Sequence, residues 1–91
     1  MNPDRPWLQS YPQGVPADID PDEYRSIAAV FAASASRYAD RPAYRNFGKE
    51  LTYAEVDALS AQFAAYLLGE LGLKKGDRVA IMMPNCLQYP I

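Results

Sequence analysis

The sequence predicts an α/β fold in which two helices and a hairpin precede a buried strand and the start of another helix. Two stretches, residues 26–38 and 52–72, carry apolar residues at helical spacing. Between them lie two short strand-like runs around a glycine. Residues 79–83 are apolar at every position, which is typical of a strand covered on both faces, as in a parallel sheet between helices.

The first helix is expected over residues 26–38, with Ser26 as the N-cap and Pro42 beyond its far end. Large residues recur along it at helical spacing and predict one buried stripe. They are Ile27, Val30, Phe31 and Tyr38. We interpret this stripe as core and not as a cofactor site.

A β-hairpin is expected next, with strands at residues 43–47 and 50–53 and a turn at Gly48-Lys49. The second long helix then begins at Thr52-Tyr53-Ala54-Glu55, which has the pattern of a capping box. It is expected to end near Gly72, with Gly69 as a weak position. Its predicted buried face consists of Val56, Leu59, Phe63, Tyr66, Leu67 and Leu71.

The strand at residues 79–83 has no parallel neighbour among these 91 residues. A helix should start at Asn85, shortly before the last residue, Ile91. We therefore expect the fold to be incomplete on its own, and the chain to be the opening of a larger, truncated domain.

Residues 1–25 read as an extended arm, because five of the eight prolines lie there and proline disfavours helix. The arm also carries large apolar residues that a solvated linker would not need. They are Trp7, Leu8, Tyr11, Val15 and Ile19. The arm is expected to lie across the body of a larger protein, and a floppy terminus is the alternative.

No catalytic, cofactor-binding or metal-binding residue is assigned. The net charge of −2 and the absence of a basic stripe argue against nucleic-acid binding. The chain has no histidine to activate its single cysteine, Cys86, which is interpreted as structural. Lys74-Lys75-Gly76 is interpreted as a solvated turn. The acidic residues Asp18, Asp20, Asp22 and Glu23 are interpreted as a solvated helix entry, and Glu55/Asp57 as capping or surface groups.

The motif Thr52-Tyr53-Ala54-Glu55, followed by residues 72–81 (GLKKGDRVAI) and Pro84-Asn85, resembles the opening of the adenylate-forming enzymes. The residues of the arm narrow this resemblance to bacterial long-chain fatty-acid–CoA ligases. Its matching elements are Trp7-Leu8, Tyr11-Pro12, Val15-Pro16, Ile19, Pro21-Asp22 and Tyr24. By this resemblance, residues 1–25 are the arm and residues 26–91 the start of the AMP-binding domain.

The resemblance implies an ATP-dependent ligase of fatty-acid degradation. A fatty-acid carboxylate would attack ATP to form acyl-adenylate and pyrophosphate, and CoA would then displace AMP, with Mg²⁺ assisting. The motifs for this chemistry are expected beyond residue 91, so the chain alone should be inactive. A cytoplasmic protein is expected, with peripheral association at the inner face of the membrane and a homodimer left open. The alternatives are an aryl- or medium-chain-CoA ligase, or a non-catalytic α/β interaction module.

Overall fold

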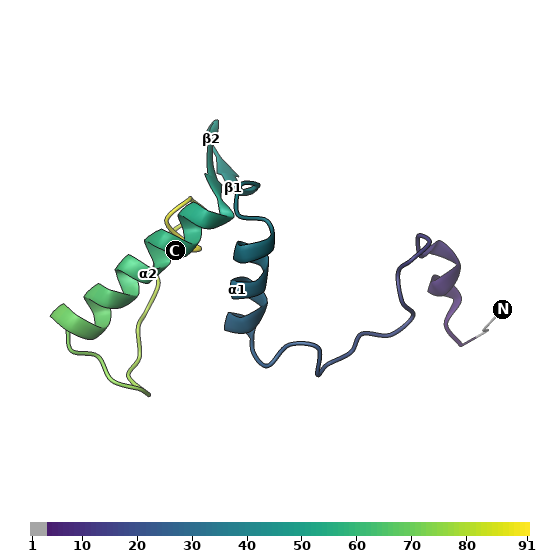
Figure 1. The fold of residues 1–91 in the computed structure, drawn as a ribbon, viewed down its shortest axis with the longest axis horizontal. Helices are drawn as coiled ribbons and strands as arrows, with labels where there is room; N and C mark the ends of the chain where they lie inside the picture. Colours follow the sequence, from purple (N-terminus) through teal and green to yellow (C-terminus); the bar gives the residue numbers. More distant parts are fainter. Residues whose placement is uncertain (1–3) are drawn as a thin grey trace.

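The computed structural model describes residues 4–91, so residues 1–3 of the predicted arm lie outside the described part. Figure 1 shows two helices joined by a hairpin, with a long amino-terminal arm on one side and an irregular carboxy-terminal segment under the second helix. The elements are the 3₁₀ helix η1 (Pro6–Ser10), the α-helices α1 (Ile27–Arg37) and α2 (Tyr53–Ala65), the strands β1 (Pro42–Asn46) and β2 (Lys49–Thr52), and the π-helical turn η2 (Tyr66–Glu70). The α/β class is confirmed.

Helix α1 begins as predicted, because the Ser26 hydroxyl accepts a 3.1 Å hydrogen bond from the Ala29 amide. The expected buried stripe is only partly formed. Ala35 is buried, whereas Ile27 is 89% exposed and Val30 is also exposed. Within the described residues, α1 packs on α2 along a short contact, which leaves Ile27 and Val30 uncovered, whereas Phe31 and Tyr38 are half-buried.

The hairpin is confirmed, but its turn lies one residue earlier than predicted. Asn46 pairs with Lys49, so the two-residue loop is Phe47-Gly48. Both residues have positive φ, 49° and 77°, as a type I′ turn requires. A bulky residue rarely adopts this conformation, which is why the sequence pattern favoured Gly48-Lys49. The register also shifts near Ala43, as in a β-bulge.

The capping box at Thr52 and Glu55 is confirmed in both directions. The Glu55 amide donates to the Thr52 hydroxyl at 3.1 Å, and the Thr52 amide donates to the Glu55 carboxylate at 3.2 Å. The amides of Tyr53 and Ala54 donate to the carbonyls of Arg41 and Ala39, each at 3.0 Å. The free amides at the start of α2 therefore bind partly to its own cap and partly to the segment that follows α1.

The second helix does not stay α-helical up to Gly72. After Ala65 it widens into η2, where the Leu71 amide donates to the Tyr66 carbonyl, five residues back. Gly69, the predicted weak position, lies inside this turn. Gly72 then ends the helix with φ of 65°, as expected of a residue just past a helix end.

The predicted buried face of α2 is mostly exposed. Val56 is buried, with 2% of its surface accessible, and Leu67 is half-buried. The remaining members of that face are exposed: Leu59, Phe63, Tyr66 and Leu71. The hydrophobic pattern predicts the helix, but the described residues cover only part of this face.

The strand predicted at residues 79–83 is absent from the structure, and so is the helix predicted from Asn85. Residues 73–84 have no regular structure apart from a turn at 75–76, and residues 85–90 form bends and turns. A strand needs a neighbour to bond its backbone, and the only ladder in the described part joins β1 to β2. Met82 is 97% exposed, so the apolar run forms no core here.

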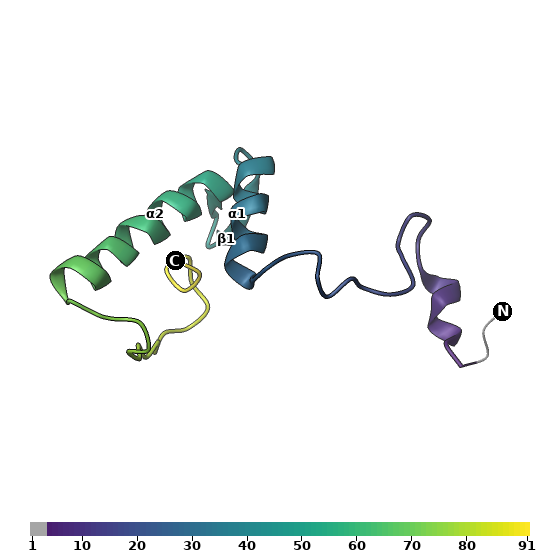
Figure 2. The ribbon, with the colours of Figure 1, turned by 60° about the horizontal axis from the view of Figure 1, so that its bottom comes forward.

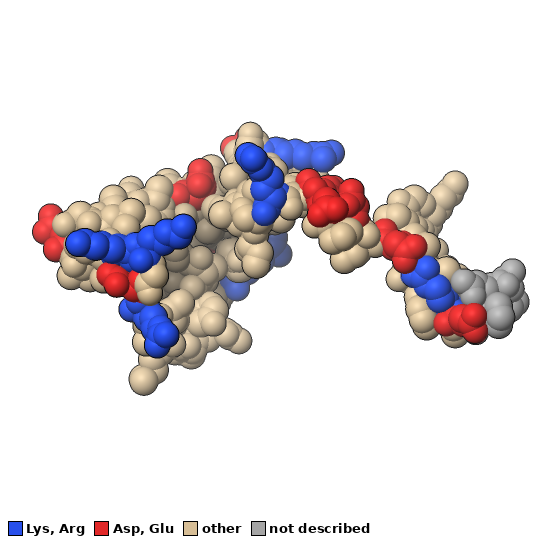
Figure 3. All heavy atoms as spheres, turned by 90° about the horizontal axis from the view of Figure 1, so that it is seen from below, with Lys and Arg blue, Asp and Glu red and all other residues tan. Residues whose placement is uncertain are grey.

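The arm is not simply extended, because its first part forms η1 and then closes on itself. Figures 1 and 2 both show this part standing away from the helices, joined to α1 by an irregular segment. Figure 3 shows acidic side chains gathered along that connection, which contains Asp20, Asp22 and Glu23. Among described residues, no helix is long and apolar enough to cross a membrane.

The structure leaves much more surface exposed than a compact protein of this mass. Its accessible area is 8197 Å², against about 5,300 Å² expected for 10.1 kDa. Its radius of gyration is 18.0 Å, against about 12 Å for a compact 91-residue domain. Ala35 and Val56 are the only buried apolar residues in the described part. Local hydrogen bonding, more than a core, therefore holds α1, the hairpin and α2 together.

We expect Gly48→Ala to weaken the hairpin by about 1 kcal/mol, because an alanine at this φ is strained although open space surrounds the position. The control is Phe47→Asn at the adjacent turn position. Phe47 is fully exposed, and asparagine suits a type I′ turn, so this change should strengthen the hairpin. Cross-strand nuclear Overhauser effects between Arg45 and Glu50 measure both. Equal effects of the two variants would contradict the turn assignment.

We expect Thr52→Ala to destabilise the start of α2 by about 1 kcal/mol, because the Glu55 amide loses its acceptor. Circular dichroism at 222 nm and Cα chemical shifts of residues 53–56 should both show the loss of helix. Ser60→Ala is the matched control, since it removes a hydroxyl from the same helix and introduces a better helix former. Loss of helix in Ser60→Ala but not in Thr52→Ala would contradict the role of Thr52 as the cap.

Candidate functional site

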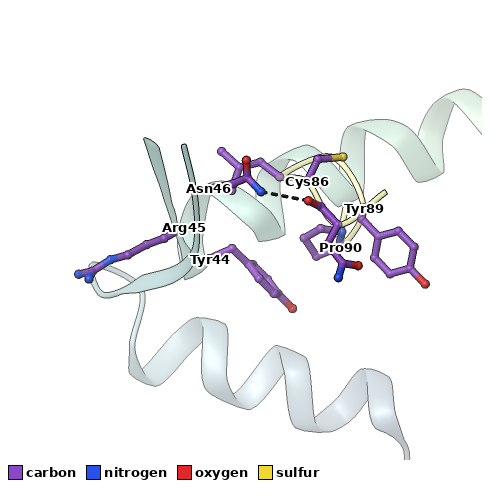
Figure 4. A pocket seen from close by; sticks show the side chains of 8 residues that line it. Tyr44, Arg45, Asn46, Cys86, Tyr89 and Pro90 are labelled. Atoms are coloured by element: carbon purple, nitrogen blue, oxygen red, sulfur yellow. Dashed lines mark hydrogen bonds between the residues drawn. The ribbon is translucent and has the colours of Figure 1, made fainter. Parts of the chain in front are cut away.

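A cavity of about 340 Å³ lies between β1 and the carboxy-terminal turns (Figure 4). Its lining residues are Tyr44, Arg45, Asn46, Asn85, Cys86, Leu87, Tyr89 and Pro90. The side-chain amide of Asn46 donates to the Asn85 carbonyl at 3.0 Å. This contact ties the last residues of the chain to the hairpin.

Three polar side chains that line this cavity, those of Arg45, Asn46 and Cys86, already have partners. Arg45 points away from it and forms a 2.6 Å ion pair with Glu50, its cross-strand partner (Figure 4). The Asn46 amide is used by Asn85, and the Cys86 thiol lies 3.9 Å from the Met83 sulfur. Binding sites need polar groups that converge on a ligand. This cavity therefore has the form of a gap between packed segments.

Cys86 lies half-buried at this cavity and is a free thiol. A cysteine nucleophile needs a neighbouring base or cation, and the chain contains no histidine. Its described contact is a thioether, which does not activate a thiol. This geometry supports the interpretation of Cys86 as structural.

A larger and more apolar hollow of about 590 Å³ lies between α2 and the carboxy-terminal segment. It is lined by Phe63, residues 79–83, Gln88, Tyr89 and Ile91. Gln88 and the Tyr89 hydroxyl are the polar side-chain groups in this lining. The hollow has the character of an uncovered core face, with no group placed for chemistry.

The turn at Lys74-Lys75-Gly76 is closed by its own acidic residue. The Lys74 amide donates to the Asp77 carboxylate at 2.8 Å, and the Asp77 amide donates back to the Lys74 carbonyl at 2.9 Å. Gly76 has φ of 95°, which glycine adopts without strain. The geometry is that of a local turn, as predicted, in which the Asp77 carboxylate accepts from the Lys74 amide.

The acidic residues of the arm do not come together as metal ligands. The Asp20 carboxylate accepts from the Asp22 amide at 2.9 Å, a local turn contact. Asp18 instead pairs with Arg5 at 2.8 Å. In the part of the chain that is described, no three His, Cys, Asp or Glu side chains form a group that could hold a metal ion.

The Arg5–Asp18 pair is the longest-range side-chain ion pair of the described residues, and sequence reasoning missed it. The hydrogen bond from Arg5 to Asp18, and then the attraction between their charges, raise the pKa of the guanidinium. A guanidinium whose pKa is raised stays charged across the ordinary pH range, so titration of Arg5 removes its contribution only at extreme alkalinity. The signal that could have revealed the pair is two opposite charges flanking the uncharged residues 6–17.

The comparisons with known proteins place the chain in a family. Residues 31–91 match the family described as AMP-binding enzyme. The chain is 55% identical over 85 residues to a long-chain-fatty-acid–CoA ligase of Salmonella typhimurium, which covers 93% of the chain, and 38% identical over 91 residues to one of Bacillus subtilis, which covers all of it. It is 36% identical over 72 residues to a salicyl-AMP ligase / salicyl-S-ArCP synthetase of Mycobacterium tuberculosis, covering 74% of the chain.

The matches cover a small part of each relative: 15% of the Salmonella protein, 16% of the Bacillus protein and 13% of the Mycobacterium protein. No solved structure matches this one significantly. The family match and the resemblance carried by Thr52–Glu55 and residues 72–81 point the same way. The chain belongs to the family of AMP-binding enzymes, and its relatives include long-chain fatty-acid–CoA ligases.

Proposed function

We propose that this chain forms the opening part of a long-chain fatty-acid–CoA ligase, with residues 1–25 as the arm and residues 26–91 as the start of the AMP-binding domain. The observation that carries the proposal is 55% identity to such a ligase over 93% of the chain. Coverage of that extent includes most of the arm, because residues 1–25 are more than a quarter of the chain. The arm is the part that supports the long-chain assignment within the family.

The proposed activity is that of the whole enzyme. It activates a long-chain fatty acid with ATP to acyl-adenylate and pyrophosphate, and then forms the thioester with CoA, feeding fatty-acid degradation. Magnesium would neutralise phosphate charge in the first step. The described residues offer neither a metal-ligand cluster nor a phosphate-binding loop, so no step is assigned to them. A cytoplasmic location, with peripheral association at the inner face of the membrane, belongs to the same proposal, as does a homodimer.

The role proposed for the chain itself is structural. It supplies α1, the hairpin and α2 as a joined unit, with apolar faces on α2 and residues 79–83 available for packing. Buried apolar area is the dominant favourable term in folding. The exposed faces therefore support a role as one packed part of a larger domain, and they weigh against an independent interaction module.

A chimera tests the proposal directly. We expect the Salmonella ligase to keep most of its palmitoyl-CoA synthesis when its matching segment is replaced by this chain, because the packing surfaces are largely shared. The matched control inserts the equivalent segment of the salicyl-AMP ligase, whose match covers only 74% of the chain. This control chimera should lose folding or activity. An inactive chimera beside an active control would contradict the proposal.

We expect the 91-residue chain alone to give no ATP–pyrophosphate exchange with palmitate, since no phosphate loop lies within it. The intact Salmonella ligase, assayed at the same molar concentration, provides the positive control. Exchange that persists in chain purified to homogeneity would overturn the assignment of the chemistry to other parts of the enzyme.

A further inference from the structure

The first part of the arm is closed into a loop by one side chain. Arg5 donates through Nη2 to the Asp18 carboxylate and to the Ala17 carbonyl, both at 2.8 Å. Its guanidinium also lies 5.9 Å from the centre of the Trp7 ring, within range of a cation–π contact. One side chain thus joins the two ends of residues 5–18.

Local structure reduces the conformational freedom that this closure must remove. Three backbone hydrogen bonds of 3.2 Å form successive turns: Leu8 to Arg5, Tyr11 to Leu8, and Val15 to Pro12. Gly14 adopts φ of 90°, and three prolines fix further φ angles. Prolines and turns lower the entropy lost when a segment binds in one shape.

The closed loop carries no charge between its two ends and exposes three large apolar side chains. Residues 6–17 contain no charged side chain, and the charges at the two ends, Arg5 and Asp18, neutralise one another. Trp7, Tyr11 and Val15 are all exposed on it, each at about half of its surface or slightly less. The loop stands away from α1 and α2 (Figures 1 and 2). It has the features of a preformed docking unit.

The comparisons indicate that long-chain ligases share the arm. The AMP-binding family match begins at residue 31, after the arm. The long-chain ligases nevertheless align over 93% and 100% of the chain, so they share the arm. The adjoining residues Asp20, Asp22 and Glu23 would be repelled by anionic lipid, which disfavours a membrane surface.

We propose that Arg5 is a positioning residue that closes residues 5–18 into a preformed apolar unit, and that Trp7, Tyr11 and Val15 of this unit dock on the body of a long-chain acyl-CoA ligase. The docking of the loop rests on the proposed function, whereas its closure by Arg5 does not. Exposed ion pairs are weak and screened by salt. The closed loop is therefore sensitive to ionic strength until docking covers it.

Closure is tested by nuclear magnetic resonance on the 91-residue chain. At low salt, Arg5 side-chain protons should show nuclear Overhauser effects to Ala17 and ring-current shifts from Trp7. Arg5→Gln should abolish both, Arg5→Lys should weaken both, and Arg25→Gln, the same charge change outside the loop, should preserve them. Absence of these signals in the unmodified chain, or their persistence in Arg5→Gln, would overturn the closure whatever the parent enzyme does.

Docking is tested in the Salmonella chimera by the rate of chymotrypsin cleavage after Trp7. Arg5→Gln should raise this rate about fivefold over the unmodified chimera, because proteolysis follows the population of the open arm. Arg25→Gln should leave it unchanged. A chimera that makes palmitoyl-CoA but is cleaved after Trp7 as fast as the 91-residue chain alone would refute docking and leave closure standing. Protection only with phosphatidylcholine vesicles present would assign the loop to lipid and also overturn docking.

Discussion

The rest of the structure depends on the hydrogen bonds at the start of α2. Thr52 ends β2, caps α2 and pairs with Pro42 across the hairpin. The next two amides bind carbonyls of Ala39 and Arg41, in the segment that follows α1. These bonds satisfy donors that every helix leaves free, and they do so with partners from another element. One junction thereby sets the positions of α1, the hairpin and α2 together.

Local signals predicted what local forces determine. The Ser26 cap, the Thr52–Glu55 box and the helix end at Gly72 each depend on a few neighbouring residues, and all three are present. The turn was displaced by one residue because Phe47 accepts positive φ against its usual preference. The apolar pattern of residues 79–83 predicts a strand, yet a strand also needs a neighbouring strand to accept and donate its backbone hydrogen bonds. Their exposure shows how far tertiary partners decide such a segment.

The candidate site shows the same contrast between contacts within a few residues, which could be predicted, and contacts between distant residues, which could not. The interpretations of Cys86 and of the Lys74 turn as structural agree with their contacts, because each is engaged by a neighbour three residues away. The Arg5–Asp18 pair could not be read from neighbouring residues, since it closes 13 positions of sequence. What the described residues present is shape and apolar surface. Its polar groups are used to hold turns, caps and the arm, and they do not converge on a reacting atom.

The junction at Thr52 also bears on the order in which the polypeptide acquires structure during translation. Its bonds connect residues 39–55, and the helices that it joins end by Ala65. Contacts so close in sequence form quickly, and domains fold from the amino terminus as they leave the ribosome. The unit of α1, hairpin and α2 can therefore form before residues 79–83 have left the ribosome. Residues 79–83 would then emerge with α2 already in place as a surface to pack on.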